Sequence, residues 1–137
     1  MNFRLLGKSG LRVSELCLGT MTFGTEWGFG TDKKDSKKVF DAFVNAGGNF
    51  LDCANLYNEG TSEKYTGEFI AHQRDYYLLA TKYTLKNPGS PNNINASGNN
   101  RKSMMNSVED SLKRLNTDYI DLLWLHAWDF LTPIDEV

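Results

Sequence analysis

Four polar residues with complementary chemistry stand out in this chain of 137 residues. Asp52, Lys82 and His126 each follow a run of apolar residues, and Tyr57 comes shortly after Asp52. A carboxylate, an ammonium, an imidazole and a phenol can together hold, donate and accept protons. Whether they cooperate depends on the elements that position them.

The apolar runs predict four strands, separated by helices. The expected strands cover residues 15–19, 49–52, 76–82 and 119–126. The expected helices begin at Asp32 or Asp35 and end before Gly47, and then cover residues 62–71 and 101–115. This alternation predicts a parallel sheet with helices outside it, and strands so apolar are expected to be covered on both faces.

Other segments connect or precede these elements. Residues 3–6 and 11–13 predict a hairpin around the turn 7–10, and residues 24–30 form a glycine-rich loop that contains Trp27. Residues 86–100, rich in Asn, Gly, Ser and Pro, predict a long surface loop. In the last helix, an apolar stripe is expected to face the core, made of Met105, Val108, Leu112 and Leu115.

In a parallel barrel the carboxyl ends of all strands open onto one face, which carries the active site. Asp52, Lys82 and His126 would therefore meet there, with Tyr57 in a loop on the same face. A phenol has a pKa of about 10, and a neighbouring ammonium favours its ionised form. The set would make a tuned proton donor and an imidazole that orients a substrate oxygen, which suits carbonyl reduction. Each residue alone is more simply explained as a cap, a solvated charge or a core histidine, but their coincidence favours function.

Three blocks of the chain resemble the signatures of the aldo-keto reductase family. Residues 3–24 read FRLLGKSGLRVSELCLGTMTFG and resemble its opening pattern. Residues 47–70 read GGNFLDCANLYNEGTSEKYTGEFI and resemble its Asp-Thr-Ala-x-x-Tyr signature, with Cys53 in place of threonine. Residues 107–129 read SVEDSLKRLNTDYIDLLWLHAWD and resemble its Ser-Leu-x-Arg-Leu-x-x-Asp-Tyr-Ile-Asp-Leu signature. The resemblance covers nearly the whole chain.

The resemblance implies an oxidoreductase that uses NADPH to reduce small aldehydes or ketones to alcohols. It implies that Tyr57 is the proton donor, that Lys82 and Asp52 tune it, and that His126 orients the carbonyl group. Cofactor contacts fall on the segment Gly19, Thr20 and Met21 and again on Asp52. Trp27 and Trp128 match rim positions, where contact with substrate and simple packing are equally good explanations.

The family fold is α/β, a parallel (β/α) barrel of TIM type. Residues 1–137 are expected to form one partial barrel domain, with only the first four strands and three helices after an N-terminal β-hairpin. Thr132 and Pro133 predict the start of a fourth helix, within which the chain stops. Barrels commonly bind phosphate in the loops after strands seven and eight. The four predicted strands do not include these loops, so this chain alone is expected to lack most of its cofactor contacts and to be inactive.

Three alternatives stay open at the level of sequence. The chain could be a non-catalytic regulatory or cofactor-sensing subunit. It could also be a half-barrel that self-associates through the two open edges of its sheet. A metal-dependent barrel hydrolase is a weaker alternative, because the two histidines of this chain are far apart in sequence and no metal-ligand cluster is evident.

Composition limits partners and location. The chain has 15 basic and 17 acidic residues, a net charge of −2, and no basic stripe that would suggest nucleic acid. No apolar stretch is long enough to span a membrane, and the N-terminus has no signal-peptide core, so a cytoplasmic location is expected. Cys17 and Cys53 are expected to be small buried hydrophobic residues rather than a disulfide. The sequence specifies neither the substrate nor the choice between NADPH and NADH.

Overall fold

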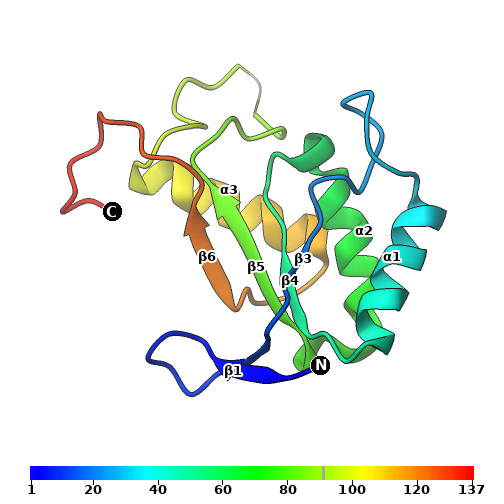
Figure 1. Ribbon diagram of the computed structural model, residues 1–137. Helices are drawn as coiled ribbons and strands as arrows, with labels where there is room; N and C mark the ends of the chain where they lie inside the picture. Colours follow the sequence, from blue (N-terminus) through cyan, green and yellow to red (C-terminus); the bar gives the residue numbers. More distant parts are fainter. Residues whose placement is uncertain (91) are drawn as a thin grey trace.

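The structure is a computed structural model that describes residues 1–90 and 92–137. A two-stranded antiparallel hairpin precedes a four-stranded parallel sheet whose strand order is β3-β4-β5-β6 (Figure 1). The strands are β1 (Phe3–Leu5), β2 (Arg12–Ser14), β3 (Leu18–Gly19), β4 (Phe50–Asp52), β5 (Leu78–Tyr83) and β6 (Leu122–Leu125). The helices are α1 (Lys33–Asn45), α2 (Thr61–Ile70) and α3 (Arg101–Leu115), with the short 3₁₀ helices η1 (Tyr57–Gly60) and η2 (Ala71–Tyr76). The predicted α/β class and partial-barrel architecture are confirmed.

The side-chain alternation of the strands divides the sheet into two faces. In β4, Leu51 is fully buried in the core between sheet and helices, while Phe50 and Asp52 line a cavity on the opposite face. The core joins all three helices to the sheet through Phe40 of α1, Phe69 of α2, and Leu115 of α3. The sheet is thereby covered on its helix side, and the other face carries the polar residues.

Local capping interactions fix where the helices begin and end. Of the two predicted N-caps of α1, the structure has Asp32, whose carboxylate accepts a hydrogen bond from the Asp35 N–H at 2.9 Å. Asn100 caps α3 in the same way. The helix ends at Asn116, which adopts the left-handed conformation with φ 50°.

The predicted apolar stripe of α3 is only partly right. Met105 is 46% exposed, and the buried face consists of serines at every fourth position followed by Leu115, namely Ser103, Ser107 and Ser111. Small side chains let α3 lie close to its neighbours. At the α2–α3 contact, a Cβ at Gly67 would overlap the Leu115 carbonyl group, so only glycine fits there.

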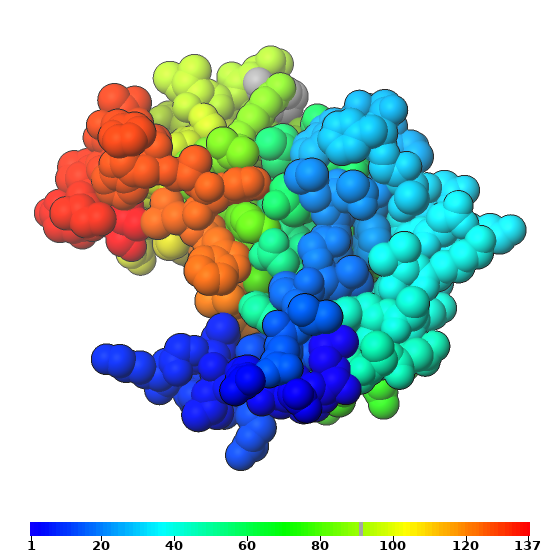
Figure 2. All heavy atoms as spheres, viewed as in Figure 1, coloured from blue at the N-terminus to red at the C-terminus, as the bar shows by residue number. Residues whose placement is uncertain are grey.

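The face of the sheet opposite the helices is open, contrary to the prediction that both faces are covered. Trp124 of β6 is 43% exposed on this face, and Cys17, predicted to be buried, is exposed on the same side. In the described residues, β3 and β6 each have a strand on one side only. Figure 2 shows the resulting hollow between the N-terminal hairpin and β6.

The predicted fourth helix is absent from the described residues. Residues 134–136 form a single turn, in which the Glu136 N–H donates to the Pro133 carbonyl at 3.0 Å. The hydroxyl group of Thr132 donates to Asp129 at 2.8 Å, and the Thr132 N–H donates to the same carboxylate at 2.9 Å. Among the described residues, no helix is long and apolar enough to cross a membrane.

All four strands of the parallel sheet begin later than predicted, and β3, for example, begins at Leu18 instead of at residue 15. Tyr76 belongs to the 3₁₀ helix η2, so β5 begins at Leu78. Asp121 precedes β6, and its carboxylate accepts hydrogen bonds from Arg74 at 2.7 Å and from the Leu79 N–H at 2.9 Å. In the described residues of the connection, 86–90 and 92–100, there is no helix or strand, as predicted, although Asn87 and Asn99 are buried.

Candidate active site

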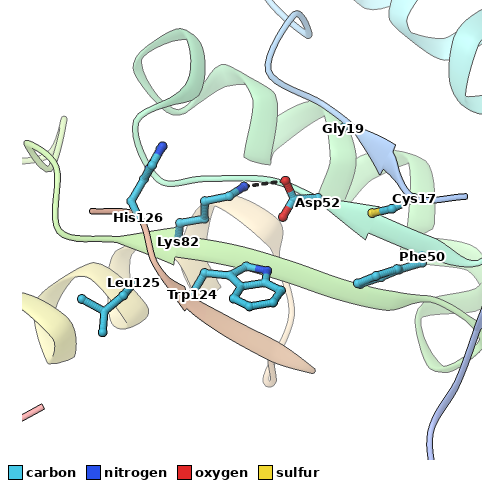
Figure 3. A pocket seen from close by; sticks show the side chains of 8 residues that line it. All are labelled: Cys17, Gly19, Phe50, Asp52, Lys82, Trp124, Leu125 and His126. Atoms are coloured by element: carbon cyan, nitrogen blue, oxygen red, sulfur yellow. Dashed lines mark hydrogen bonds and ion pairs between the residues drawn. The ribbon is translucent and has the colours of Figure 1, made fainter. Parts of the chain in front are cut away.

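Neighbouring strands deliver the candidate side chains to one edge of the sheet. Asp52 is the last residue of β4, Lys82 is the last but one of β5, and His126 directly follows β6. The parallel register pairs Asp52 with Gly19 of β3 and Lys82 with Trp124 of β6. Figure 3 shows Lys82 extended towards Asp52, with His126 beside it.

The Lys82 ammonium is held by two acceptors. Its Nζ lies 2.6 Å from Asp52 Oδ2 and 2.6 Å from the Cys53 carbonyl oxygen. The Lys82 and Asp52 side chains are 14% and 29% exposed. Because the pair is largely shielded from water, the attraction between the two charges is stronger than in a surface ion pair.

Tyr57 lies beside this ion pair at the start of η1. The Lys82 ammonium is 4.8 Å from the centre of the Tyr57 ring, which is a cation–π contact. The His126 ring meets the Tyr57 ring edge-on, with centroids 5.8 Å apart and planes at 89°. The Lys82 ammonium forms no hydrogen bond with the Tyr57 hydroxyl group in the described structure, so it contacts the phenol through the ring. The four predicted residues nevertheless converge on one place.

His126 is held in its neutral form. Burial lowers the pKa of its imidazole, the Lys82 ammonium lowers it further, and the Asp52 carboxylate acts in the opposite direction. Its Nδ1 atom is buried and, among the described residues, has no hydrogen-bond partner. A neutral imidazole can bind a substrate oxygen without competing with Lys82 for Asp52.

The predicted cofactor segment divides into exposed and buried members. Gly19 and Met21 are exposed, and a Cβ at Gly19 would meet open space. Thr20 is fully buried, and its hydroxyl group bonds the Asp52 carbonyl at 3.2 Å and the Ser62 hydroxyl at 2.8 Å. Thr20 therefore holds the segment against β4 and α2, and only its two neighbours are exposed.

The two tryptophans occupy different surroundings. Trp27 meets the edge of the Tyr57 ring, with centroids 6.2 Å apart and planes at 83°. Trp128 lines a separate cavity between the loop after β5 and the segment after β6. Trp27 thus borders the candidate site, whereas no contact in the described structure joins Trp128 to Tyr57.

A cavity of about 550 Å³ lies on the open face of the sheet, next to the strand ends that carry Asp52, Lys82 and His126. Its polar wall is Asp52, Lys82 and His126, and Phe50 and Trp124 are apolar members of its lining (Figure 3). The alternation of the strand residues could have identified this apolar part, since Phe50 and Trp124 lie two residues before Asp52 and His126. Within the described ranges no group of three or more potential ligands is arranged to hold a metal ion.

The cavity also contains a cysteine whose thiol is kept protonated. Cys17 is exposed at the surface of the cavity, but neighbouring protein atoms displace part of the water around its thiol; this desolvation raises the pKa of Cys17 to about 12, and the Asp52 carboxylate contributes in the same direction. The Lys82 ammonium opposes this shift. Cys17 is therefore a weak nucleophile at neutral pH, although part of its side chain is accessible.

Fold and site together define a class of protein: a parallel β/α barrel architecture with a Tyr, Lys, Asp and His cluster at its strand ends. Residues 15–137 match the family model described as "Aldo/keto reductase family". The chain belongs to this family of oxidoreductases.

Relatives and a solved structure agree with this assignment. The chain is 48% identical to norsolorinic acid reductase of Aspergillus flavus, over 98% of this chain and 37% of that protein. It is 46% identical to an aryl-alcohol dehydrogenase [NADP(+)] of Phanerodontia chrysosporium, over 93% of this chain and 36% of that protein. The aldo-keto reductase AKR11C1 of Bacillus halodurans, in its holo form, superposes with a TM-score of 0.83 at 36% identity, over 99% of this chain and 43% of that chain. The chain thus spans a little over a third of the length of these curated relatives.

Proposed function

We propose that this cluster carries out the reduction of an aldehyde or ketone to an alcohol. Tyr57 donates the proton to the carbonyl oxygen, Lys82 and Asp52 tune that donor, and His126 orients the oxygen. The observation that supports these roles best is the position of the Lys82 ammonium, bonded to Asp52 and 4.8 Å from the Tyr57 ring. A cation in this place stabilises negative charge as it develops on the phenol oxygen.

The proposed cofactor is NADPH, which supplies the hydride when it is bound. The residues at the strand ends fit a nicotinamide-bearing group, because Gly19 leaves open space and Asp52 presents a carboxylate to the cavity. Met21 offers an exposed apolar side chain next to them. The naming of a relative as an aryl-alcohol dehydrogenase [NADP(+)] supports both NADPH and an aryl carbonyl substrate. Trp27 would contact such a substrate at the rim of the site. Trp128 would not contact it, and would instead pack between the loop after β5 and the segment after β6.

We further propose that residues 1–137 form one partial barrel domain that turns over little or not at all by itself. Its open sheet face would leave a bound substrate in contact with water on the cavity side, and water weakens the electrostatic stabilisation on which such sites depend. The test follows NADPH absorbance with the purified chain and a reactive aryl aldehyde. Sustained turnover would contradict this part of the proposal.

The catalytic roles are best tested in a hybrid enzyme. Residues 1–137 would replace the matching 37% of the Aspergillus flavus norsolorinic acid reductase. Tyr57→Phe in the hybrid removes the proton donor and leaves the ring, so we expect kcat to fall about 10²–10⁴-fold, the usual contribution of general acid catalysis. The control is Tyr119→Phe, which changes a tyrosine that packs against Arg74 outside the site. Equal rates for the two variants would refute the role of Tyr57.

A second proposal concerns self-association. The strands β3 and β6 each have a free edge in the described sheet, and Trp124 and Leu125 of β6 are exposed beside one of these edges. Free edges and exposed apolar residues favour pairing with another chain. Sedimentation of the purified chain over a range of concentrations tests this, and a monomer at every concentration would contradict it.

A further inference from the structure

The loop between β3 and α1 rests on the turn that follows Tyr57. The loop includes Met21 and Trp27, and the turn contains Asn58 and Glu59. Two separate contacts anchor Trp27 to this turn. Its backbone N–H donates to Asn58 Oδ1 at 3.3 Å, and its indole Nε1 donates to Glu59 Oε1 at 3.3 Å.

Asn58 uses both ends of its amide to hold the loop. Its Nδ2 donates to the Met21 carbonyl at 2.8 Å, while its Oδ1 accepts from Trp27. The residue is fully buried, so these partners are not readily replaced by water. A single side chain thereby connects Met21, the last residue of the candidate cofactor segment, with Trp27 at the substrate rim.

The backbone of the turn is unusual and directs Asn58 towards the loop. Asn58 has φ 45°, Glu59 has φ 54°, and Gly60 has φ 90°. Left-handed conformations are unfavourable for residues other than glycine, and asparagine is among those that tolerate them best. Gly24 makes room on the other side, because a Cβ there would lie 2.6 Å from the Asn58 Cβ. The close approach of loop and turn therefore depends on both residues.

Asn58 also sets where Trp27 lies relative to Tyr57. Asn58 follows Tyr57 directly in the chain, and the two aromatic rings meet edge-on. With the His126 ring on another side of Tyr57, three aromatic rings border the place where a substrate carbonyl would bind. A flat aromatic group is the ligand that such a wall accommodates best.

We propose that Asn58 is a positioning residue that fixes Met21 and Trp27 about Tyr57 and so makes the site selective for aromatic carbonyl substrates. The proposal rests on the proposed reductase function but assigns no chemical step to Asn58. Its amide acts through Trp27 and Met21, not on the reacting atoms.

The first test uses the isotope-labelled chain of 137 residues and needs no turnover. Asn58→Gly suits the left-handed backbone and removes both amide contacts, and Asn116→Gly makes the same change at another left-handed asparagine, at the end of α3. We expect hydrogen exchange of the Trp27 amide to accelerate about tenfold or more in Asn58→Gly and to stay near the original rate in Asn116→Gly. The Leu79 amide, in the sheet, reports on the fold and should be unchanged. Equal Trp27 exchange in all three proteins, or equal acceleration at Leu79, would overturn the proposal.

The second test measures recognition with unreactive alcohols. Benzyl alcohol, an aromatic product, should shift the Trp27 indole N–H resonance, and cyclohexylmethanol should bind about tenfold more weakly. Asn58→Gly should reduce this preference to about twofold or less, because the wall is no longer held in place. A preference that survives the substitution would refute the role of Asn58. Neither result depends on hydride transfer, so failure here is distinct from failure of the Tyr57→Phe experiment.

Discussion

The Lys82–Asp52 ion pair makes the most direct prediction about stability. Asp52→Asn keeps the shape of the side chain and removes its charge, so the Lys82 ammonium is left with neutral acceptors only, the introduced amide oxygen and the Cys53 carbonyl. Removing one partner of a fully buried pair costs about 3–5 kcal/mol, while an exposed pair contributes about 0–1 kcal/mol. With side chains that are 14% and 29% exposed, this pair lies between those limits. We expect a loss of about 2 kcal/mol.

The assay is urea unfolding of the purified chain, followed by tryptophan fluorescence at pH 7. Asp41→Asn is the matched control, because Asp41 forms an i,i+4 pair with Lys37 in which both side chains are nearly half exposed. Its loss should be about 0.3–0.5 kcal/mol. A double-mutant cycle with Lys82→Met should give a coupling energy above about 1 kcal/mol. If Asp52→Asn cost no more than Asp41→Asn, the claim that this pair is shielded from water would be wrong.

Three further predictions concern other titratable groups. Because the pKa of His126 is lowered in the folded chain, the unfolded chain binds that proton first, so the free energy of unfolding should decrease as pH falls below about 6.5. The urea midpoint should be lower at pH 5.5 than at pH 7.5. This difference should become smaller in His126→Gln and stay the same in the control His72→Gln. Glu63→Gln leaves the Arg114 guanidinium without its carboxylate at a fully buried position, so urea unfolding should show a loss of about 3–5 kcal/mol, and a loss under about 1 kcal/mol would contradict the geometry. Cys17, with its pKa raised to about 12, should be alkylated by iodoacetamide at pH 8 more than tenfold more slowly than free cysteine, and urea should abolish the difference.

The sequence predicted the elements that depend on local signals. The bounds of α3 were predicted as found, because the helix lies between an asparagine cap and a left-handed asparagine and has no interrupting residue. The position of Asp52 at the end of β4 was also correct, since a short apolar run that ends in a charge marks the edge of a sheet. The convergence of four distant residues followed from one rule of parallel sheets, that the carboxyl ends of strands share one edge.

Other features depended on contacts between distant residues. The serine face of α3 could not be read from helical periodicity, because it reflects how closely the helix approaches α2 at Gly67. The contacts of Thr132 could not be predicted either, because its hydroxyl group and its backbone N–H both bind the Asp129 carboxylate. Burial was misjudged for Cys17 because apolar neighbours in sequence do not reveal that the sheet face beside them is open.

By itself, the sequence determined the α/β alternation, the parallel sheet and the identity of the residues that meet at its edge. Hydrophobic periodicity and capping groups act over a few residues, so they are legible in a linear chain. Only the tertiary structure decided how those residues touch. It placed the Lys82 ammonium against the ring of Tyr57 and joined Met21 to Trp27 through the Asn58 amide. Such contacts form between segments that are far apart in sequence, and their geometry is set by the packing of the whole sheet and its helices.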